Sequence, residues 1–344
     1  MALPPALAAA LTTAISGLPA RDLTAAAKGL SARYREQRGS FLRGAADVTA
    51  YAAFRLPATY AATMAALSQV RAAEPDLRPT SLLDLGAGPG TGAWAACAVW
   101  PEIQHITFIE RDPHMLALGK ELAAAAPSFA LRDATWRPTD ITGDWQVEPA
   151  DLVIAAYTLG ELPPEQQPGF PEKLWRHALQ TGVIIEPGTP QGWRVVEEAS
   201  RALATLGAHI VAPAPIAWDC LAGRDDWLHF AARVARTRLH RSVKGADLSY
   251  EDEKFSYVAG SRLPAQQIAA RVIRRPQIRS GHIRLTVCTP EGVREIVVTR
   301  THREAFRRAK DLRWGDAIGP EEAEVFGLPS TSDQTGSDPR HRRD

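Results

Sequence analysis

Hydrophobic positions change their spacing about a quarter of the way along the chain. Over roughly the first 75 residues, apolar residues recur every three or four positions, which indicates helices. Three helices are expected, at residues 3–15, at 22–38 with Asp22 as N-cap, and at 48–73 with a break at Pro57. No strand pattern interrupts them, so the sequence predicts an N-terminal helical extension over residues 1–75.

From Ser81 the pattern becomes short apolar runs alternating with helical windows, as in a parallel sheet with helical crossovers. The expected strands are 81–85, 105–110, 129–132, 151–156, 182–186 and 208–211. The expected helices are 90–99, 113–126, 168–180 and 193–206. The fold class predicted for residues 76–230 is therefore α/β, with a Rossmann-like, doubly wound sheet.

The pattern changes again after Asp226. We expect a basic helix, then strands at 267–274, 282–289 and 293–300, and a last helix at 303–312. Pro290-Glu291-Gly292 is typical of a hairpin turn between the last two strands. This predicts a small β-containing module over residues 231–316. A polar tail follows over 317–344, and we expect it to be disordered from about Ser330.

Composition sets limits on this picture. The 344 residues allow two domains, and with 45% hydrophobic and 23% charged residues the chain is globular rather than fibrous or coiled-coil. The 40 Lys and Arg nearly balance the 39 Asp and Glu, which excludes a uniformly basic nucleic-acid coat. The three cysteines are too few to staple a fold of this size and favour a reducing compartment. No apolar stretch is long enough to span a membrane, and residues 3–15 lack the basic start of a signal peptide, so we expect a cytoplasmic protein.

Overall neutrality hides a basic segment. Residues 231–314 carry a net charge of +11, against −6 for residues 1–230 and −4 for 315–344. Most of its cations are arginines, whose planar guanidinium suits phosphate groups and stacks on bases. The segment predicts contact with RNA or the ribosome. The alternative is a basic helix face that only meets solvent.

A glycine-rich turn follows the first strand of the sheet. Residues 82–91 read LLDLGAGPGT, an apolar strand that enters a turn and then a helix, and glycines let the backbone bend there and approach a ligand. The dinucleotide fingerprint G-x-G-x-x-G fits poorly, because its sixth position is Thr91. The pattern D-x-G-x-G-x-G resembles instead the first motif of class I S-adenosylmethionine-dependent methyltransferases. The cofactor contacts this implies are Asp84, Gly86, Ala87, Gly88, Gly90 and Thr91.

The same resemblance implies further contacts at later strand ends. They are Glu110 with Arg111 for the ribose, Asp133 with Ala134 for the adenine, and Tyr157 at the fourth strand's exit, where Tyr157 and Glu161 are the candidate catalytic residues. Each has a structural alternative. Asp84 could cap a helix, Glu110 could pair with Arg111, Asp133 could be a turn residue, and Tyr157 could only pack. Glu161 and Glu186 are acid–base candidates or anchors of neighbouring loops.

Three phrases outside the glycine turn carry a more specific resemblance. Residues 51–60 (YAAFRLPATY), 185–192 (IEPGTPQG) and 253–257 (EKFSY) resemble motifs of the methyltransferase-like proteins of the mitochondrial ribosomal small subunit and their bacterial relatives. The resemblance runs from about residue 45 to 316. It implies a sheet domain that holds S-adenosylmethionine and a partner in the small ribosomal subunit or its rRNA, without a membrane. The oligomeric state is left open, with a monomer favoured.

Members of that family carry four cysteines proposed to hold an iron–sulfur cluster or a metal. The matching positions here are Ala214, Cys220, Leu228 and Cys288, so two of the four thiols remain. A cluster or a structural zinc site needs four ligands, and this set is incomplete even if His229 or Asp219 could substitute. We expect packing around Ala214 and Leu228 to replace the metal, and stoichiometric iron and sulfide in anaerobically purified protein would refute this.

The sequence leaves three functions open. They are an rRNA methyltransferase, a non-catalytic assembly protein of the small subunit with a structural or regulatory cofactor pocket, and a small-molecule methyltransferase. The fourth-strand exit reads Ala155-Ala156-Tyr157-Thr158, with neither the Asn/Asp-Pro-Pro-Tyr phrase of base N-methylation nor a cysteine nucleophile. An enzyme is favoured but not required by the sequence. The basic segment places a ribosomal role above a small-molecule one.

Overall fold

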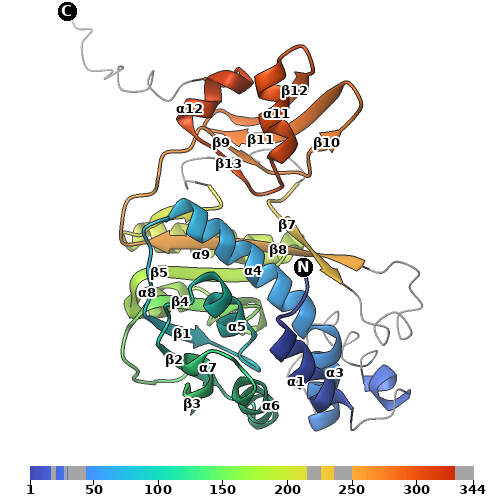
Figure 1. Cartoon of the computed structure of the whole chain (residues 1–344). Coiled ribbons are helices and arrows are strands. Elements are labelled where there is room, and N and C mark those ends of the chain that lie inside the picture. The colour runs from blue at the N-terminus through green and yellow to red at the C-terminus, as the bar shows by residue number, and fades with distance from the viewer. Residues whose placement is uncertain (17–20, 27–28, 30–43, 215–225, 236–249, 330–344) are drawn as a thin grey trace, which may run out of the picture. The chain divides into compact units, whose positions relative to one another are not determined.

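The computed structural model describes residues 1–16, 21–26, 29, 44–214, 226–235 and 250–329 (Figure 1). The chain divides into two compact units. The larger unit comprises Met1–Pro213 and Ala231–Ala265, and the smaller unit comprises Ala214–Phe230 and Gln266–Asp344. The division differs from the predicted boundary at residue 231, because the chain crosses from one unit to the other more than once.

Helices begin the larger unit, as the sequence predicted. They include α1 (Pro5–Ile15), α3 (Ala45–Phe54) and α4 (Leu56–Ala73). The break expected at Pro57 falls at Arg55, since the proline occupies the first turn of α4, where its missing N–H is tolerated. Residues 21–26 are helical, and the rest of the helix expected to Arg38 lies mostly outside the described residues.

The central sheet of the larger unit is mostly parallel. Its order is β3-β2-β1-β4-β5-β8-β6, with β7 also paired to β8. The parallel strands are β1 (Ser81–Leu85), β2 (His105–Glu110), β3 (Thr135–Pro138), β4 (Ala150–Ala156) and β5 (Ala178–Pro187). The strand β8 (Tyr250–Ser261) runs antiparallel between β5 and β6 (His209–Ala212). This arrangement confirms the α/β, Rossmann-like fold class.

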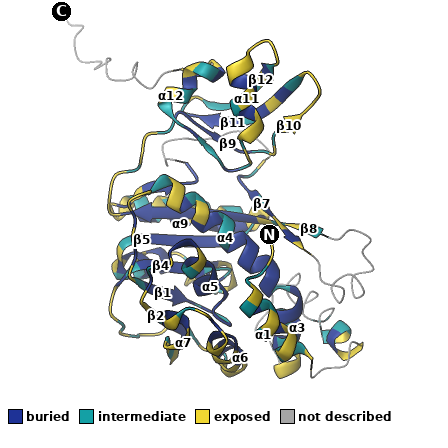
Figure 2. Cartoon of the chain, viewed as in Figure 1, coloured by how far each residue is buried: buried dark blue, intermediate teal, exposed yellow. Residues whose placement is uncertain are grey.

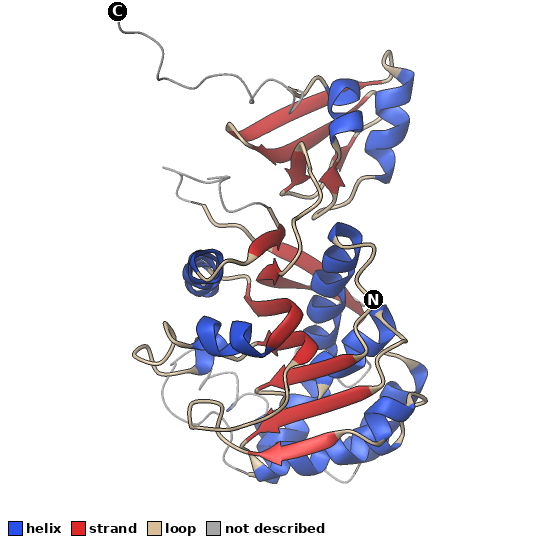
Figure 3. Cartoon of the chain, turned by 90° about the vertical axis from the view of Figure 1, so that its left-hand side faces the viewer, coloured by secondary structure: helices blue, strands red, loops and turns tan. Residues whose placement is uncertain are grey.

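Helices cover both faces of this sheet (Figure 3). The elements α8 (Phe170–His177) and α9 (Pro190–Thr205) pack on one face, where Leu83, Val153 and Ile184 meet Leu174 and Val196 in a buried core. The helices α5 (Thr91–Val99) and α6 (Pro113–Ala124) pack against the first four strands, and α4 packs against β8 and β6. The central strands β1, β4 and β5 are accordingly buried over most of their length, as Figure 2 shows.

Three predictions about strands and helices were wrong. Residues Phe129–Arg132 form a short helix, α7, and the third strand begins at Thr135. The basic helix expected after Asp226 is in part a strand, β7 (Phe230–Ala235), and the strand β8 was not predicted. In the first case a short apolar run was taken for a strand, although such runs fit either structure. In the others, the alternation of apolar positions was obscured, because β7 is rich in alanine and β8 has four consecutive charged residues after Tyr250.

The smaller unit is a five-stranded sheet with helices on one face. Its strands are β9 (Ala270–Val272), β10 (Gln277–Ile278), β11 (His282–Thr289), β12 (Gly292–Thr299) and β13 (Ala317–Ile318). Alternate β11 residues, from Ile283 to Val287, pack against α11 (Arg303–Asp311), α12 (Pro320–Ala323) and the turn Glu324–Phe326. The β11–β12 hairpin confirms the predicted turn. Residues from Ser330, expected to be disordered, lie outside the described part.

Among the helices that the structure describes, none combines the length and the apolar character needed to cross a bilayer.

Candidate ligand-binding site

The glycine turn lies where β1 ends and α5 begins. Gly86, Gly88 and Gly90 have φ angles of 67°, 54° and 78°, a region that favours glycine. The backbone N–H groups of Gly86 and Ala87 both donate to the carbonyl of Ile109, at 2.9 and 3.0 Å, so the turn is tied to β2. The helix that follows begins at Thr91 with its N–H groups directed at the turn.

The two sides of this turn differ. A Cβ on Gly86 would lie 2.4 Å from Cγ2 of Thr158, so that side is filled by protein. A Cβ on Gly88 would meet nothing within 4 Å. The turn is therefore packed on its inner side and open at Gly88, where a ligand can approach the backbone.

Asp84 is the buried acid of the turn, only 2% exposed on β1. It accepts a hydrogen bond from the backbone N–H of Ala93, so it caps α5 as the structural alternative proposed. Its Oδ2 has no hydrogen-bond partner among the described residues. Burial raises the pKa of Asp84 to about 7. A capping role thus leaves one oxygen for a donor on a ligand.

Glu110 ends β2 and reaches the same turn. Its Oε2 accepts from the N–H of Gly88 and its Oε1 from the N–H of Asp112, both at 2.8 Å. Burial is the largest influence on the pKa of Glu110 and raises it, although the backbone donors act in the opposite direction. Each carboxylate oxygen keeps a second lone pair, so Glu110 can still accept from a sugar diol. It does not form the ion pair with Arg111 that was the alternative.

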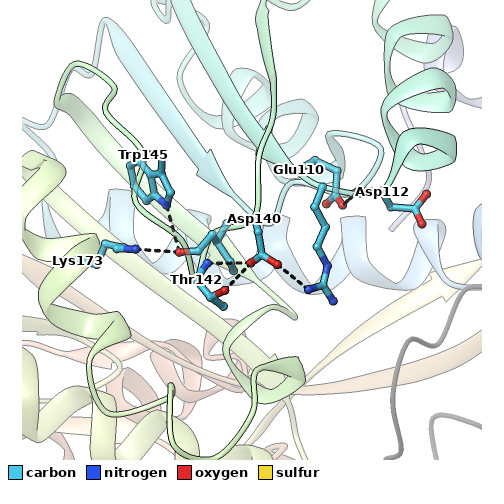
Figure 4. A network of polar contacts seen from close by, with 8 residues as sticks. Glu110, Asp112, Asp140, Thr142, Trp145 and Lys173 are labelled. Carbon is cyan, nitrogen blue, oxygen red and sulfur yellow. Dashed lines mark hydrogen bonds and ion pairs between the residues drawn. The ribbon is translucent and has the colours of Figure 1, made fainter.

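Arg111 pairs instead with Asp140, which follows β3 (Figure 4). Nη1 of Arg111 donates to Oδ2 of Asp140 at 2.8 Å, while Oδ1 accepts from the backbone and hydroxyl of Thr142 at 2.9 and 2.8 Å. Burial alone would raise the pKa of Asp140, but these donors lower it. The carboxylate is therefore charged and fixed beside the ends of β2 and β3.

The loop after Asp140 is held by α8 (Figure 4). Nζ of Lys173 donates to the carbonyls of Ile141 and Gly143 at 3.1 and 2.6 Å, and the indole N–H of Trp145 also donates to Ile141 at 3.1 Å. Lys173 lies 5.2 Å from the Trp145 ring centroid. These contacts fix the backbone on which Asp140 is carried.

Asp133 does not lie where the sequence predicted. It follows α7 and is exposed, and Ala134 immediately precedes β3, so both residues are at the amino end of that strand. The acid at the carboxyl end is Asp140, which the sequence analysis missed. Its signal was the Thr135-Trp136 pair, whose residue types favour a strand, followed by Pro138 and Asp140. Trp136 packs on Phe108 of β2 with ring centroids 3.9 Å apart.

At the exit of β4, Tyr157 is held by two distant residues. It is a non-glycine residue with a φ of 60°, and its N–H donates to Ile185 at 2.7 Å. Its hydroxyl donates to Oε1 of Glu253, at 3.1 Å, and Arg55 donates to both oxygens of the same carboxylate, at 2.9 and 3.3 Å. The guanidinium of Arg55 is also 5.8 Å from the Tyr157 ring. Burial raises the pKa of Tyr157.

Glu186 anchors the turn after β4, which is one of the two roles that the sequence left open for it. It is 1% exposed and accepts from the N–H of Thr158, at 3.1 Å, and from those of Leu159 and Gly160. Burial raises the pKa of Glu186 to about 8. Glu161 lies exposed in the same turn, Leu159–Glu161. Within the described residues, the acid beneath the turn is thus engaged by the backbone.

The family's cysteine positions lie in the smaller unit. Cys288 is buried on β11 and is disulfide-bonded, which departs from the reducing compartment expected from the sequence. Cys220 lies outside the described residues, and Cys97 is a free thiol. Leu228 is buried, as the packing hypothesis requires. In the described parts of the chain, no group of three or more His, Cys, Asp or Glu side chains is placed to hold a metal.

Comparison with protein families gives one match over most of the chain. Residues 45–319 match the family described as mitochondrial small ribosomal subunit Rsm22. The human protein named ribosome assembly protein METTL17, mitochondrial, is 26% identical over 83% of this chain and 65% of its own length. Rsm22-cox11 tandem protein 2, mitochondrial, of Schizosaccharomyces pombe is 25% identical over 83% of this chain and 45% of its own. The chain thus spans less than two thirds of each relative.

Solved structures with a similar fold include methyltransferases. Magnesium protoporphyrin IX methyltransferase of Synechocystis with bound SAH is 12% identical, with a TM-score of 0.41 over 68% of this chain and 94% of that one. The N-methyltransferase NodS of Bradyrhizobium japonicum is 13% identical, with a TM-score of 0.36 over 57% and 92%. The fold assignment rests on the strand order of the sheet itself.

The expected cytoplasmic location is contradicted by these comparisons. The matching family and the human and fission-yeast relatives are all described as mitochondrial. The expectation came from few cysteines and from the lack of a membrane-spanning stretch. Those features suit any reducing aqueous compartment and do not separate one from another.

Proposed function

Because this chain belongs to the mitochondrial small ribosomal subunit Rsm22 family, we propose that it binds S-adenosylmethionine and acts with the small ribosomal subunit. The observation that carries the proposal is the turn from Asp84 to Gly90, which is open at Gly88 and flanked by the buried Asp84 and the half-buried Glu110. Such a turn at the carboxyl ends of parallel strands is where ligands bind in folds of this kind. The partner is supported by the relative named as a ribosome assembly protein.

The residues present fit the cofactor. The unpartnered Oδ2 of Asp84 would accept from its ammonium group, and Glu110 would accept from its ribose hydroxyls. Asp140, with Arg111, borders the ends of β2 and β3, where the adenine would lie. When bound, the cofactor supplies a methyl group already activated by its sulfonium, so the protein needs only to align an acceptor.

Between methylation and assembly, the geometry at β4 favours assembly. Tyr157, the candidate that would face an acceptor, donates its hydroxyl to Glu253, and that carboxylate also pairs with Arg55. Glu186 accepts hydrogen bonds from three backbone N–H groups. Tyr157 and Glu186 are thus committed to the protein itself, whereas Glu161 is exposed. We therefore place the assembly role, with the cofactor as a structural or regulatory ligand, above rRNA methylation.

The cofactor site is tested by calorimetry on the full chain with S-adenosylmethionine. Gly88→Ala adds a methyl group toward the open side of the turn, so it should weaken binding at least tenfold. Gly207→Ala is the matched control, because Gly207 also has a positive φ of 87° and open space around its Cβ, but follows α9. If both variants bind like the original chain, or the original gives no heat, the cofactor proposal fails.

The partner is tested by co-sedimentation with small ribosomal subunits at increasing salt. We expect binding that weakens as salt rises, because phosphate contacts release counterions. A second assay supplies labelled S-adenosylmethionine to subunits and to naked rRNA. Absence of transfer with retained co-sedimentation supports assembly over methylation, whereas stoichiometric transfer to one nucleotide would reverse that order.

A further inference from the structure

Several cations of the smaller unit form no ion pair within the part of the chain that the structure describes. Arg274 pairs with Asp226, Arg294 with Glu291, and Arg308 with both Glu304 and Glu322. Other cations of this unit form no ion pair with any described residue; these are Arg279, Arg284, Arg300, Arg303, Arg307, Lys310 and Arg313. All seven are exposed. Like charges that are clustered on a surface repel one another, and binding of a molecule of opposite charge relieves this repulsion.

Three of these cations form a row on α11. Arg303, Arg307 and Lys310 are spaced by four and three residues, which places them on one face of the helix. The opposite face is buried through Ala305, Phe306 and Ala309. At about 1.5 Å of rise per residue, the row extends about 10 Å along the helix axis.

The row continues onto the adjoining ends of the strands. The N–H of Arg300 donates to Gly281 at 3.2 Å, and the N–H of Arg279 donates to His282 at 2.9 Å, so the two arginines come from neighbouring segments. The Arg300 guanidinium lies 5.7 Å from the Phe306 ring centroid, and Lys310 lies 5.3 Å from the same ring. We call Arg279, Arg300, Arg303, Arg307 and Lys310 the cationic ridge.

Neighbouring acids leave most of the ridge charge uncompensated. Glu304 on the same helix forms an ion pair with Arg308, with a distance of 3.1 Å between Oε1 and Nη2. Asp311 is one turn beyond Arg307 at the helix end, but forms no ion pair with a described residue. Of the two acids on α11 itself, only Asp311 is not engaged by another cation among the described residues, against five cations of the ridge.

We propose that the cationic ridge binds the sugar–phosphate backbone of double-helical RNA, an inference that rests on the proposed ribosomal role. Four of its five cations are arginines, which hold phosphate oxygens through two parallel hydrogen bonds. Binding to single strands relies on bases stacked on exposed aromatic rings. The ridge offers none, because Phe306 is buried.

An acidic protein surface is the less suitable partner. Protein interfaces depend on apolar and aromatic anchors at their centre. The large exposed hydrophobic side chains described in this unit are Ile278 and Val297, and neither belongs to the ridge. A surface of cations without apolar anchors matches contact with phosphates, whose affinity is dominated by charge.

The test measures binding of the full chain to an RNA duplex of about 20 base pairs over a range of salt concentrations. The variant combines Arg303→Gln, Arg307→Gln and Lys310→Gln. At about 0.1 M salt we expect its affinity to fall on the order of 100-fold, and the slope of log affinity against log salt to decrease in magnitude by about 2 to 3. The control is Arg308→Gln on the same helix, which should change affinity less than threefold because Arg308 is already paired.

Each outcome decides the inference. An unchanged affinity in the triple variant, or an equal loss in the Arg308→Gln control, overturns it. So does tighter binding to a single strand of the same length. If the triple variant binds the duplex normally but no longer co-sediments with small subunits, the ridge contacts a protein instead. Co-sedimentation of the original chain and its heat of cofactor binding report on the proposed function separately, so failure at the ridge is distinguishable from failure of that function.

Discussion

The carboxyl edge of the sheet has two halves, the ends of β1 and β2 and the ends of β4 and β5, and their polar groups differ in whether they have hydrogen-bond partners. At β1 and β2, Asp84 keeps an oxygen without a partner and Gly88 faces open space. At β4 and β5, Tyr157 and Glu186 are both engaged by the chain itself. Buried polar groups without partners are costly, and a donor supplied by a ligand is one way in which such a group is satisfied. This difference is what the proposal of a ligand site at the first half, and of none at the second, rests on.

Both halves nevertheless bury an acid. Asp84 and Glu186 are almost fully buried, and burial raises the pKa of each, to about 7 and about 8. Glu186 offsets this cost with three backbone donors, whereas Asp84 has one. In the first half, Oδ2 of Asp84 therefore still lacks a hydrogen-bond donor among the described residues.

Gly86→Ala should give the largest effect. The new Cβ would meet Thr158 at 2.4 Å on a backbone with φ of 67°, so clash and strain should together destabilise the fold by about 3 kcal/mol or more. Denaturant unfolding measures the loss. Gly207→Ala, which has the positive φ but no clash, should cost only about 1 kcal/mol. Equal losses in the two variants would show that the contact between the halves is not tight.

Glu253→Ala tests whether the second half is independent of the first. It leaves the Arg55 charge and the Tyr157 hydroxyl without their acceptor, which should cost about 2 kcal/mol given that Arg55 is a third exposed. Arg176→Ala, which breaks an exposed pair on α8, should cost less than about 0.5 kcal/mol. Affinity for S-adenosylmethionine should stay within twofold of the original. A parallel loss of affinity would mean that the halves form one site.

The raised pKa values predict stability that falls as pH rises. Between pH 5 and 8 the folded protein holds protons on Asp84 and Glu186 that the unfolded chain releases, so folding is favoured at the acidic end of this window. The expected slope is at most about 1.4 kcal/mol per pH unit for each group. Urea unfolding across this range measures it. Asp84→Asn should flatten the slope below pH 7, and an unchanged slope would contradict the assignment.

Arg111→Gln should give the smallest change in stability. Arg111 and Asp140 are both substantially exposed, so loss of their ion pair should cost within about 0.5 kcal/mol. Affinity for S-adenosylmethionine should fall severalfold, because Asp140 loses the donor that fixes it beside β3. Thermal unfolding and calorimetry on the same sample separate the two effects. A stability loss above about 2 kcal/mol would make the pair structural.

The glycine turn could be predicted because its signal is local. Asp84, the glycines and the start of the following helix at Thr91 lie within ten residues, and their conformations depend on residue type. The third strand could not be located in this way, since residues 129–132 and 135–138 are both short and partly apolar. Because that strand was misplaced, the acid expected at its carboxyl end was Asp133, whereas the structure has Asp140 there.

The contacts of Tyr157 at the second half of the edge could not be predicted, because the residues that make them are far apart in the chain. Arg55 and Tyr157 are 198 and 96 residues from Glu253. The three phrases that carried the family resemblance nonetheless each supply one acid or base of that region, namely Arg55, Glu186 and Glu253. Glu186 and Ser256 are register partners in β5 and β8, which explains why two of those phrases belong together.

The position of β8 also constrains how the protein is made. This strand lies between β5 and β6, although both of those precede it in the chain. A nascent polypeptide that has reached only residue 249 therefore displays two unsatisfied strand edges, each able to recruit a foreign strand. Completion of the sheet waits for translation of Tyr250–Ser261, and the interval before it is the period in which the emerging chain most needs a chaperone.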